Sequence, residues 1–148
     1  RNLVSRFGDV EELHAHNSNI LWSEIADVAD LIDNPKKILW RLSVPPATGA
    51  NIANAIKEFS DAEIYFDWGG GLIWVGISPD DGALAEEVRS LLIDSGGHAT
   101  LMRAPDDIRR ITPVFQPQTP AVAALTEKLK KNFDPKGIIN PGRMYMTE

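Results

Sequence analysis

The sequence predicts an α+β fold, and three observations over residues 37–104 lead to that prediction. Four short runs are rich in branched and aromatic residues, as β-strands usually are. Apolar stripes at helical spacing lie between the first and second runs and between the third and fourth. Glycine or proline stands where the chain must turn or where a strand must stop. The resulting order, β-α-β-β-α-β, is that of the ferredoxin-like arrangement, an antiparallel sheet with two helices on one face.

Each predicted strand has a boundary signal in the sequence. The strands are expected at residues 37–44, 63–68, 72–78 and 98–103. Pro45 and Pro46 stop the first strand, because proline has no N–H group to donate to the ladder. Residues 69–71 are three glycines and form a turn, so the second and third strands make a hairpin.

Each helix of the predicted core has a cap and an apolar stripe. Thr48 caps a helix over residues 49–59, and Asp80 or Asp81 caps a second helix that ends at residues 96–97, both glycine. The stripes are Ile52, Ile56 and Phe59 in the first helix and Leu84, Val88, Leu91 and Leu92 in the second. We expect both stripes to be buried against the sheet.

Helices are also predicted on both sides of this core. Residues 1–17 have no clear period and are interpreted as a linker, whereas residues 19–32 are predicted to form one helix that ends before Pro35. Residues 105–110 form a short helical turn, and Thr119 with Pro120 opens a last helix. The expected buried stripe of that helix is Val122, Leu125 and Leu129. We expect the tail, residues 105–148, to pack on the same domain as the core.

Strand alternation sorts the side chains of the sheet into two expected faces. One face is large and aromatic: Trp40, Leu42, Phe66, Trp68, Leu72, Trp74, Thr100 and Met102. The other is mostly aliphatic: Leu39, Tyr65, Ile73, Val75, Ile77, Ala99 and Leu101, with Arg41 and Arg103. We expect the helices to cover the aliphatic face. The aromatic face is then covered either by the terminal helices or by another domain, a subunit or a flat ligand.

Composition excludes several classes of function. The chain has 15 basic and 21 acidic residues, and this net charge of -6 argues against a nucleic-acid partner. It has no cysteine, which excludes disulfides, cysteine nucleophiles and iron–sulfur ligation by the chain itself. No apolar run approaches the roughly 20 residues that span a bilayer. The chain begins with Arg1 rather than methionine, so we interpret it as a piece of a longer protein.

Three charged or titratable residues in the strands are candidates for binding a substrate. Arg41 and Arg103 need partners, because an unpaired charge is costly to bury. A substrate carboxylate is one such partner, and Asp67 on a neighbouring strand is the alternative. His98 follows two glycines and is either a base or a structural residue at a strand edge.

The segment Asn140, Pro141, Gly142 and Arg143 is the strongest candidate for cofactor binding. Glycine allows the backbone to approach a ligand closely, and arginine binds carboxylate or phosphate with a planar fork. The alternative is a tight turn that tethers the tail, with Arg143 in a surface ion pair. No metal site is expected, because the only histidine pair is His14 and His16 and two ligands rarely suffice.

The end of the chain carries a long motif with fixed prolines and glycines. Residues 129–144 read LKKNFDPKGIINPGRM. This segment resembles the closing motif of FAD-linked oxidases of the vanillyl-alcohol-oxidase type. Residues 39–46 (LWRLSVPP) and 97–104 (GHATLMRA) resemble, more narrowly, the FAD-binding E subunits of bacterial glycolate oxidases. The resemblance covers the chain from about residue 39 to its end.

The resemblance implies the cap domain of a flavoprotein, in which residues 140–143 lie near the flavin. It implies a fragment of an FAD-dependent 2-hydroxyacid (glycolate) oxidase or dehydrogenase subunit that is inactive alone, with FAD held mainly by a preceding N-terminal domain. The implied partners are that domain, other glycolate oxidase subunits including an iron–sulfur subunit, and a small 2-hydroxyacid. The implied location is cytoplasmic, at the inner membrane through the complex. The rival hypothesis is a free-standing ferredoxin-like module that binds a small molecule or a protein.

Overall fold

A computed structural model describes residues 4–142, 144 and 145 of the chain. The chain divides into two compact units, Arg1–Asp33 and Asn34–Glu148. The predicted strands and the helices between them all lie in the second unit, so the candidate sites of the sheet and of the tail belong to that unit.

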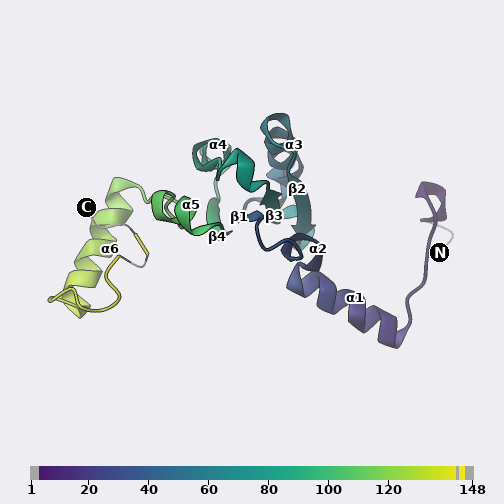
Figure 1. Cartoon of the computed structure of the whole chain (residues 1–148), viewed down its shortest axis with the longest axis horizontal. Helices are drawn as coiled ribbons and strands as arrows, with labels where there is room; N and C mark the ends of the chain where they lie inside the picture. Colours follow the sequence, from purple (N-terminus) through teal and green to yellow (C-terminus); the bar gives the residue numbers. More distant parts are fainter. Residues whose placement is uncertain (1–3, 143, 146–148) are drawn as a thin grey trace. The chain divides into compact units, whose positions relative to one another are not determined.

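The second unit contains a four-stranded antiparallel sheet with the strand order β2-β3-β1-β4 (Figure 1). Its strands are β1 (Ile38–Ser43), β2 (Glu63–Asp67), β3 (Leu72–Ile77) and β4 (His98–Arg103). The order places β1 and β3 in the centre, which agrees with their largely buried residues. The predicted α+β fold of ferredoxin-like type is confirmed.

The first core helix has the predicted bounds but a different cap. It is α3 (Gly49–Phe59), and a 3-10 turn, η2 (Pro46–Thr48), leads into it. The side chain of Thr48 does not cap the helix, because its hydroxyl donates a hydrogen bond of 2.8 Å to the carbonyl oxygen of Pro45. The apolar stripe is confirmed at Ile52 and Ile56, whereas Phe59 at the end of the helix is exposed.

The second core helix is shorter than predicted. It is α4 (Ala85–Ser90), and it begins after Leu84 instead of at Asp80 or Asp81. The two aspartates belong to a separate 3-10 turn, η4 (Pro79–Asp81). The prediction of one continuous helix was wrong here because Leu84 has a positive φ of +49°, which an α-helix cannot contain.

The hydrophobic core lies between the sheet and the helices α3 and α4. Trp40 of β1 stands opposite Val75 of β3 and Leu101 of β4, and all three are buried. The core continues with Ile38, Leu42, Ile73, Ile77 and Ala99 from the strands and with Ile52, Ile56, Val88 and Leu92 from the helices and the turn after α4. The Trp40 indole N–H donates a hydrogen bond of 2.8 Å to the Ala83 carbonyl, so its polar atom is satisfied.

The predicted sorting of side chains was wrong for β1 and β2. Directly opposite residues of antiparallel strands point to the same side, so Trp40, Leu42 and Phe66 share the helix-covered face with Ile73 and Val75. Leu39, Arg41 and Tyr65 belong to the other face, with Trp74. The alternation within one strand does not fix its phase relative to the next strand, because the pairing register sets that phase. The uncovered face is therefore mixed in character instead of uniformly aromatic.

The connection after the sheet covers the outer edge of β4. The short helix α5 (Asp106–Ile111) confirms the turn predicted at residues 105–110. Beyond it, the Leu101 amide donates to the Val114 carbonyl at 2.9 Å, and the Ala99 amide donates to Oε1 of Gln116 at 3.3 Å. This segment takes the place of a fifth strand and satisfies an edge that would otherwise be open.

The helices outside the core differ from the prediction in continuity and burial. The first unit has η1 (Ser5–Phe7), α1 (Ala15–Asp27) and α2 (Ala29–Ile32), and Val28 at φ +55° interrupts what was predicted as one helix. The last helix is α6 (Pro120–Phe133), and none of its residues is buried. The predicted burial of Val122, Leu125 and Leu129 was wrong, since each is about half exposed.

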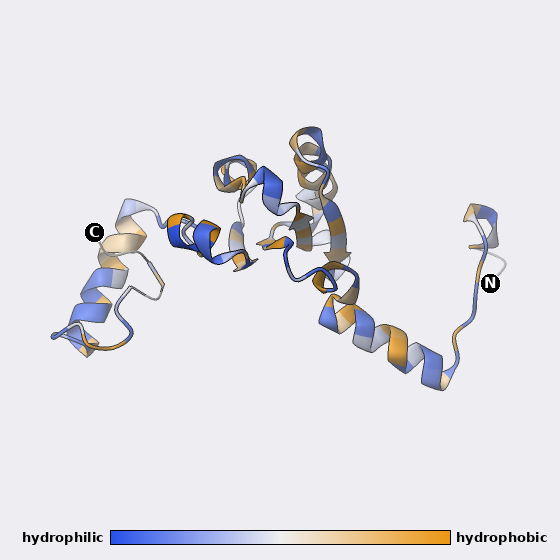
Figure 2. Cartoon of the chain, in the orientation of Figure 1, coloured by the Kyte–Doolittle hydropathy of each residue, from blue (hydrophilic) through white to orange (hydrophobic). Residues whose placement is uncertain are grey.

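Apolar residues lie along α1 and α6 as well as in the sheet (Figure 2). Within the described residues, no helix is both long enough and apolar enough to cross a membrane.

Candidate functional site

The sheet face opposite α3 and α4 carries a row of side chains that crosses all four strands. In the strand order β2-β3-β1-β4, the register places side by side Tyr65, Trp74, Arg41 and Thr100. All four remain partly exposed. On the central strand β1, a guanidinium group thus stands between an indole on one side and a hydroxyl on the other. We call this surface the open face.

A second row of the open face brings another candidate next to Arg41. In the same strand order this row consists of Asp67, Leu72, Ser43 and His98. Arg41 and His98 are therefore diagonal neighbours on β1 and β4, within reach of one small ligand between them. The structure thus brings Arg41 and His98, two of the three predicted substrate residues, next to each other.

Trp68 extends the open face beyond the end of β2. It begins the 3-10 turn η3 (Trp68–Gly70), where its backbone N–H donates a hydrogen bond of 2.7 Å to the Asp67 carboxylate. The guanidinium carbon of Arg41 lies 5.3 Å from the centroid of the Trp68 ring, which is a cation–π distance. Trp68 is 61% exposed, so this contact leaves one face of the guanidinium and much of the indole accessible.

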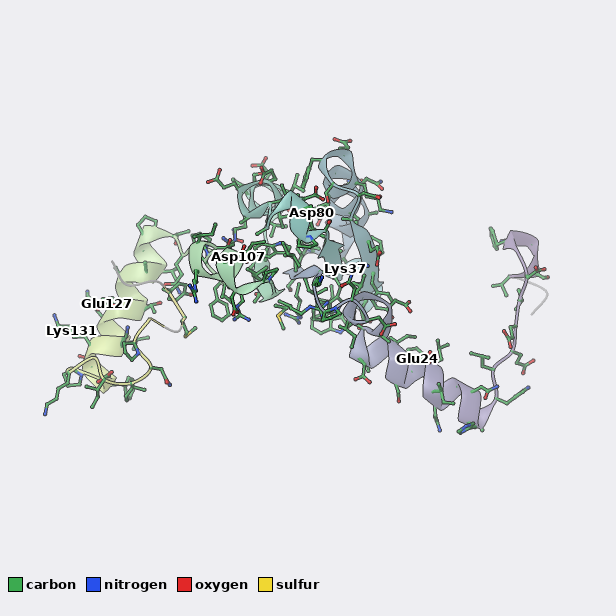
Figure 3. The ribbon with its side chains drawn as sticks, in the orientation of Figure 1. Glu24, Lys37, Asp80, Asp107, Glu127 and Lys131 are labelled. Atoms are coloured by element: carbon green, nitrogen blue, oxygen red, sulfur yellow. The ribbon has the colours of Figure 1, made fainter. Side chains whose placement is uncertain are left out.

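Arg41 has no carboxylate partner in the described part of the chain. The salt bridge found there joins Nζ of Lys37 to Oε1 of Glu63 at 2.5 Å, and Lys37, just before β1, is labelled in Figure 3. Asp67, the alternative partner predicted for Arg41, bonds the Trp68 backbone instead. A partly buried guanidinium without a counter-charge is well suited to bind a carboxylate from outside.

Arg103, the third predicted substrate residue, is held by the main chain. Its Nε donates to the Lys37 carbonyl at 3.2 Å and its Nη2 donates to the Asn34 carbonyl at 2.8 Å. A β-bulge between the partners of Leu39 and Trp40 sets Arg103 opposite Leu39. These bonds tie the residues just before β1 to the end of β4, so the Nε and Nη2 donors of Arg103 are used within the chain.

The predicted cofactor segment lines a cavity against α6. The cavity has a volume of about 920 Å³, and its apolar lining includes Leu129, Phe133, Ile139, Met144 and Tyr145. Asn140 and Gly142 lie in its wall with positive φ angles of +44° and +71°. Pro141 lies between them, and Arg143 is outside the described residues. Glu127 of α6 also lines the cavity, and Figure 3 marks it together with Lys131 on that helix.

Asp134 shapes the turn that folds this segment back along α6. Its carboxylate accepts hydrogen bonds from the backbone N–H groups of Ile138 at 3.1 Å and Ile139 at 2.7 Å. These bonds, that of Ile139 foremost, lower the pKa of the Asp134 carboxyl below its usual value. The ring centroids of Tyr145 and Phe115 lie 6.2 Å apart, so the end of this segment contacts the connection between α5 and α6.

Arg89 is a buried charge that the sequence did not indicate as important. Its Nη2 donates hydrogen bonds to the carbonyls of Pro113 and Phe115, and its guanidinium carbon lies 5.1 Å from the centroid of the Trp40 ring. Its partners lie 24 and 26 residues farther along the chain, so the neighbouring sequence gives no sign of this role. Arg89 thus fastens the connection between α5 and α6 to the core.

No group of three or more histidine, aspartate and glutamate side chains that could hold a metal ion occurs among residues 4–142, 144 and 145. His98 lies on the open face, whereas His16 belongs to α1 in the first unit.

The chain matches one curated protein over 107 residues with 32% identity. It is similar to glycolate oxidase subunit GlcE of Escherichia coli (strain K12). The match covers 72% of this chain and 26% of GlcE, so the chain spans about a quarter of the length of that relative. The resemblance to GlcE that was predicted from the motifs is confirmed. No family model and no solved structure matches the chain.

Proposed function

We propose that this chain is the cap portion of an FAD-dependent 2-hydroxyacid oxidase or dehydrogenase subunit of the glycolate oxidase type. The similarity to GlcE carries the proposal, because it joins this chain to a named component of that enzyme. The chain spans only 26% of GlcE, so in this proposal a separate domain holds most of the FAD and the chain alone is inactive.

The open face fits one side of a flavin ring. Arg41 offers a cation beside the flat side chains of Trp68, Trp74 and Tyr65, which suits a planar ring with polar edges. When bound, the flavin supplies the redox chemistry.

Within this proposal, the residues of the open face orient a 2-hydroxyacid. Arg41 holds the substrate carboxylate, because its charge is otherwise unpaired and a guanidinium matches a carboxylate. Trp68 and Trp74 exclude water from the bound acid. His98, the diagonal neighbour of Arg41, accepts the hydroxyl proton on its imidazole. The resemblance of residues 129–144 to the closing motif of FAD-linked oxidases supports a place near the flavin for the segment of residues 140–143.

Other subunits of the enzyme, including an iron–sulfur subunit, complete the proposed assembly. GlcE is by name one subunit of glycolate oxidase, which supports an assembly of several chains. This chain has no cysteine, so it supplies no thiolate ligand to the proposed iron–sulfur cluster.

The test is the visible absorbance spectrum of the longer protein, purified with its partner subunits and with added FAD, before and after glycolate. We expect a flavin band that this 148-residue chain alone does not give, and bleaching of the band by glycolate. The variant Arg41→Gln should keep the band and need roughly tenfold or more glycolate for half-bleaching, because it loses a charge-assisted carboxylate contact. Arg110→Gln is the matched control, since Arg110 is an exposed arginine on α5.

Each outcome of this experiment separates one part of the proposal. A parent protein that binds no flavin under these conditions contradicts the cap assignment and favours the free-standing ferredoxin-like module. A flavin band that glycolate does not bleach is consistent with the cap assignment but contradicts the proposal that this subunit binds the substrate. An unchanged glycolate dependence in Arg41→Gln contradicts the role of Arg41.

A further inference from the structure

A groove lies between α4 and the connection that follows α5, away from the open face. It has a volume of about 490 Å³. Its lining includes Glu86, Arg89, Ile93, Ile111, Thr112 and Gln116. The open face and the α6 cavity share none of these residues.

Arg89 is the only cation in the lining of this groove, and it is 9% exposed. Both protons of its Nη2 are used, by the carbonyls of Pro113 and Phe115. Nε is buried without a partner in the described residues. Nη1 also has no partner there, but it is not among the buried atoms.

The charge of Arg89 is not balanced by any carboxylate in the described part of the chain. The salt bridge found there lies elsewhere, between Lys37 and Glu63. Glu86 in the groove wall is exposed and makes no ion pair with Arg89. Burial lowers the pKa of the Arg89 guanidinium, with no opposing effect from a carboxylate. A buried cation of this kind is stabilised when an acceptor with negative charge reaches it.

The remaining lining adds donors and apolar contact area. Gln116 uses its carboxamide oxygen for the Ala99 amide, so its NH₂ group is left to donate. Thr112 places a hydroxyl in the same wall. Ile93 and Ile111 are 77% and 79% exposed and both line the groove, so they add accessible apolar surface to it.

We propose that this groove binds a segment of a partner protein that places a carboxylate side chain at Arg89 and apolar side chains against Ile93 and Ile111. The charge complementarity identifies the carboxylate, and the two exposed isoleucines identify its apolar neighbours. An arginine surrounded by apolar residues is also the usual composition of a binding hot spot. This surface is additional to the proposed flavin cap, and its test needs no flavin.

The test is nuclear magnetic resonance of the 148-residue chain, with labelled arginine Nε–Hε groups and isoleucine methyl groups. The probe is the blocked tripeptide N-acetyl-Ile-Glu-Ile-amide, and the matched control peptide has glutamine in place of glutamate. We expect the glutamate peptide to shift the signals of Arg89, Ile93 and Ile111 and to bind roughly tenfold tighter than the glutamine peptide. Arg109→Gln, which changes an exposed arginine outside the groove lining, should leave this binding unchanged.

Arg89→Gln would remove the bonds to the connection as well as the charge, so a loss of binding in that variant would not be specific. Two variants at exposed residues avoid this problem. Ile93→Ser and Ile111→Ser change exposed residues and should weaken glutamate-peptide binding several-fold with the fold intact. Three results would overturn the proposal: equal binding of the two peptides, the same shifts with sodium acetate alone, or peptide binding unaffected by both serine variants. Concentration-dependent dimerisation that blocks the peptide would also overturn it, because the occupant would then be a second copy of this chain.

Discussion

The helices of the βαββαβ core and the helix α6 have similar apolar patterns, but they differ in whether the apolar side is buried. In the core, the apolar stripe of α3 meets the sheet, and Ile56 is fully buried. On α6, a stripe of the same helical spacing leaves Leu125 59% and Leu129 51% exposed. Amphipathic spacing therefore shows that a helix has an apolar side, but it does not show whether that side has a partner within the same chain.

The largest effect should come from the removal of a buried aromatic residue of the core. Trp40→Ala should lower the free energy of unfolding by about 3–5 kcal/mol, because it empties a buried site and removes the bond to Ala83. Trp68→Ala removes a mostly exposed indole and should cost about 1 kcal/mol or less. Urea unfolding of both variants measures the difference, and equal losses would contradict the burial described for Trp40.

The next effect concerns Arg89, which joins the core to the connection leading to α6. Arg89→Met should lower the free energy of unfolding by about 2 kcal/mol. Two carbonyls lose a charged donor, and the removal of a desolvated charge offsets only part of that loss. Amide exchange should accelerate at Leu101, whose partner is Val114, more than in β3. Arg109→Met is the exposed control and should stay within about 0.5 kcal/mol of the parent chain.

A smaller effect is expected on α6 itself. The double variant Leu125→Ser and Leu129→Ser should change the free energy of unfolding of this chain by less than about 1 kcal/mol, since neither side chain is buried. A loss above about 2 kcal/mol in thermal or urea unfolding would mean that α6 packs on the core within the isolated chain. That result would remove the contrast between the two regions.

The smallest effect is local and depends on pH. The pKa of Asp134 is lowered in the folded turn, so its carboxylate favours the turn at neutral pH, where the group is charged in both states. This contribution is fully present above the ordinary pKa near 3.8 and is lost as the pH falls through the lower folded value. Amide signals of Ile138 and Ile139 should shift in that range. Asp134→Asn should remove the shift. A midpoint above pH 4 for the amide signals of Ile138 and Ile139 would contradict the lowered pKa of Asp134.

Local signals were sufficient for most of the strands and for one core helix. The prolines after Val44 and the glycines at residues 69–71 mark real strand ends, and the helix Gly49–Phe59 has its predicted bounds. The second core helix was predicted too long, because nothing in its composition shows that Leu84 takes a positive φ. Such a conformation is stabilised by the surrounding structure rather than by the residue.

The candidate site was only partly predictable. Arg41 and His98 were named from residue type, but their place on one face follows from the pairing of β1 with β4. Arg103 has the same residue type as Arg41, yet it bonds two main-chain carbonyls. Arg89 gave no signal, because its partners lie 24 and 26 residues away in the chain.

The sequence by itself determined the order of the strands and core helices, the class of the fold and the resemblance to GlcE. These follow from local propensity, turn residues and motifs, which are written in contiguous residues. Only the tertiary structure decided which side of the sheet holds Trp40 and which holds Arg41, and which apolar stripe is buried. The physical reason is that register and burial depend on contacts between segments distant in the chain, and one residue of register moves every side chain of a strand to the opposite face.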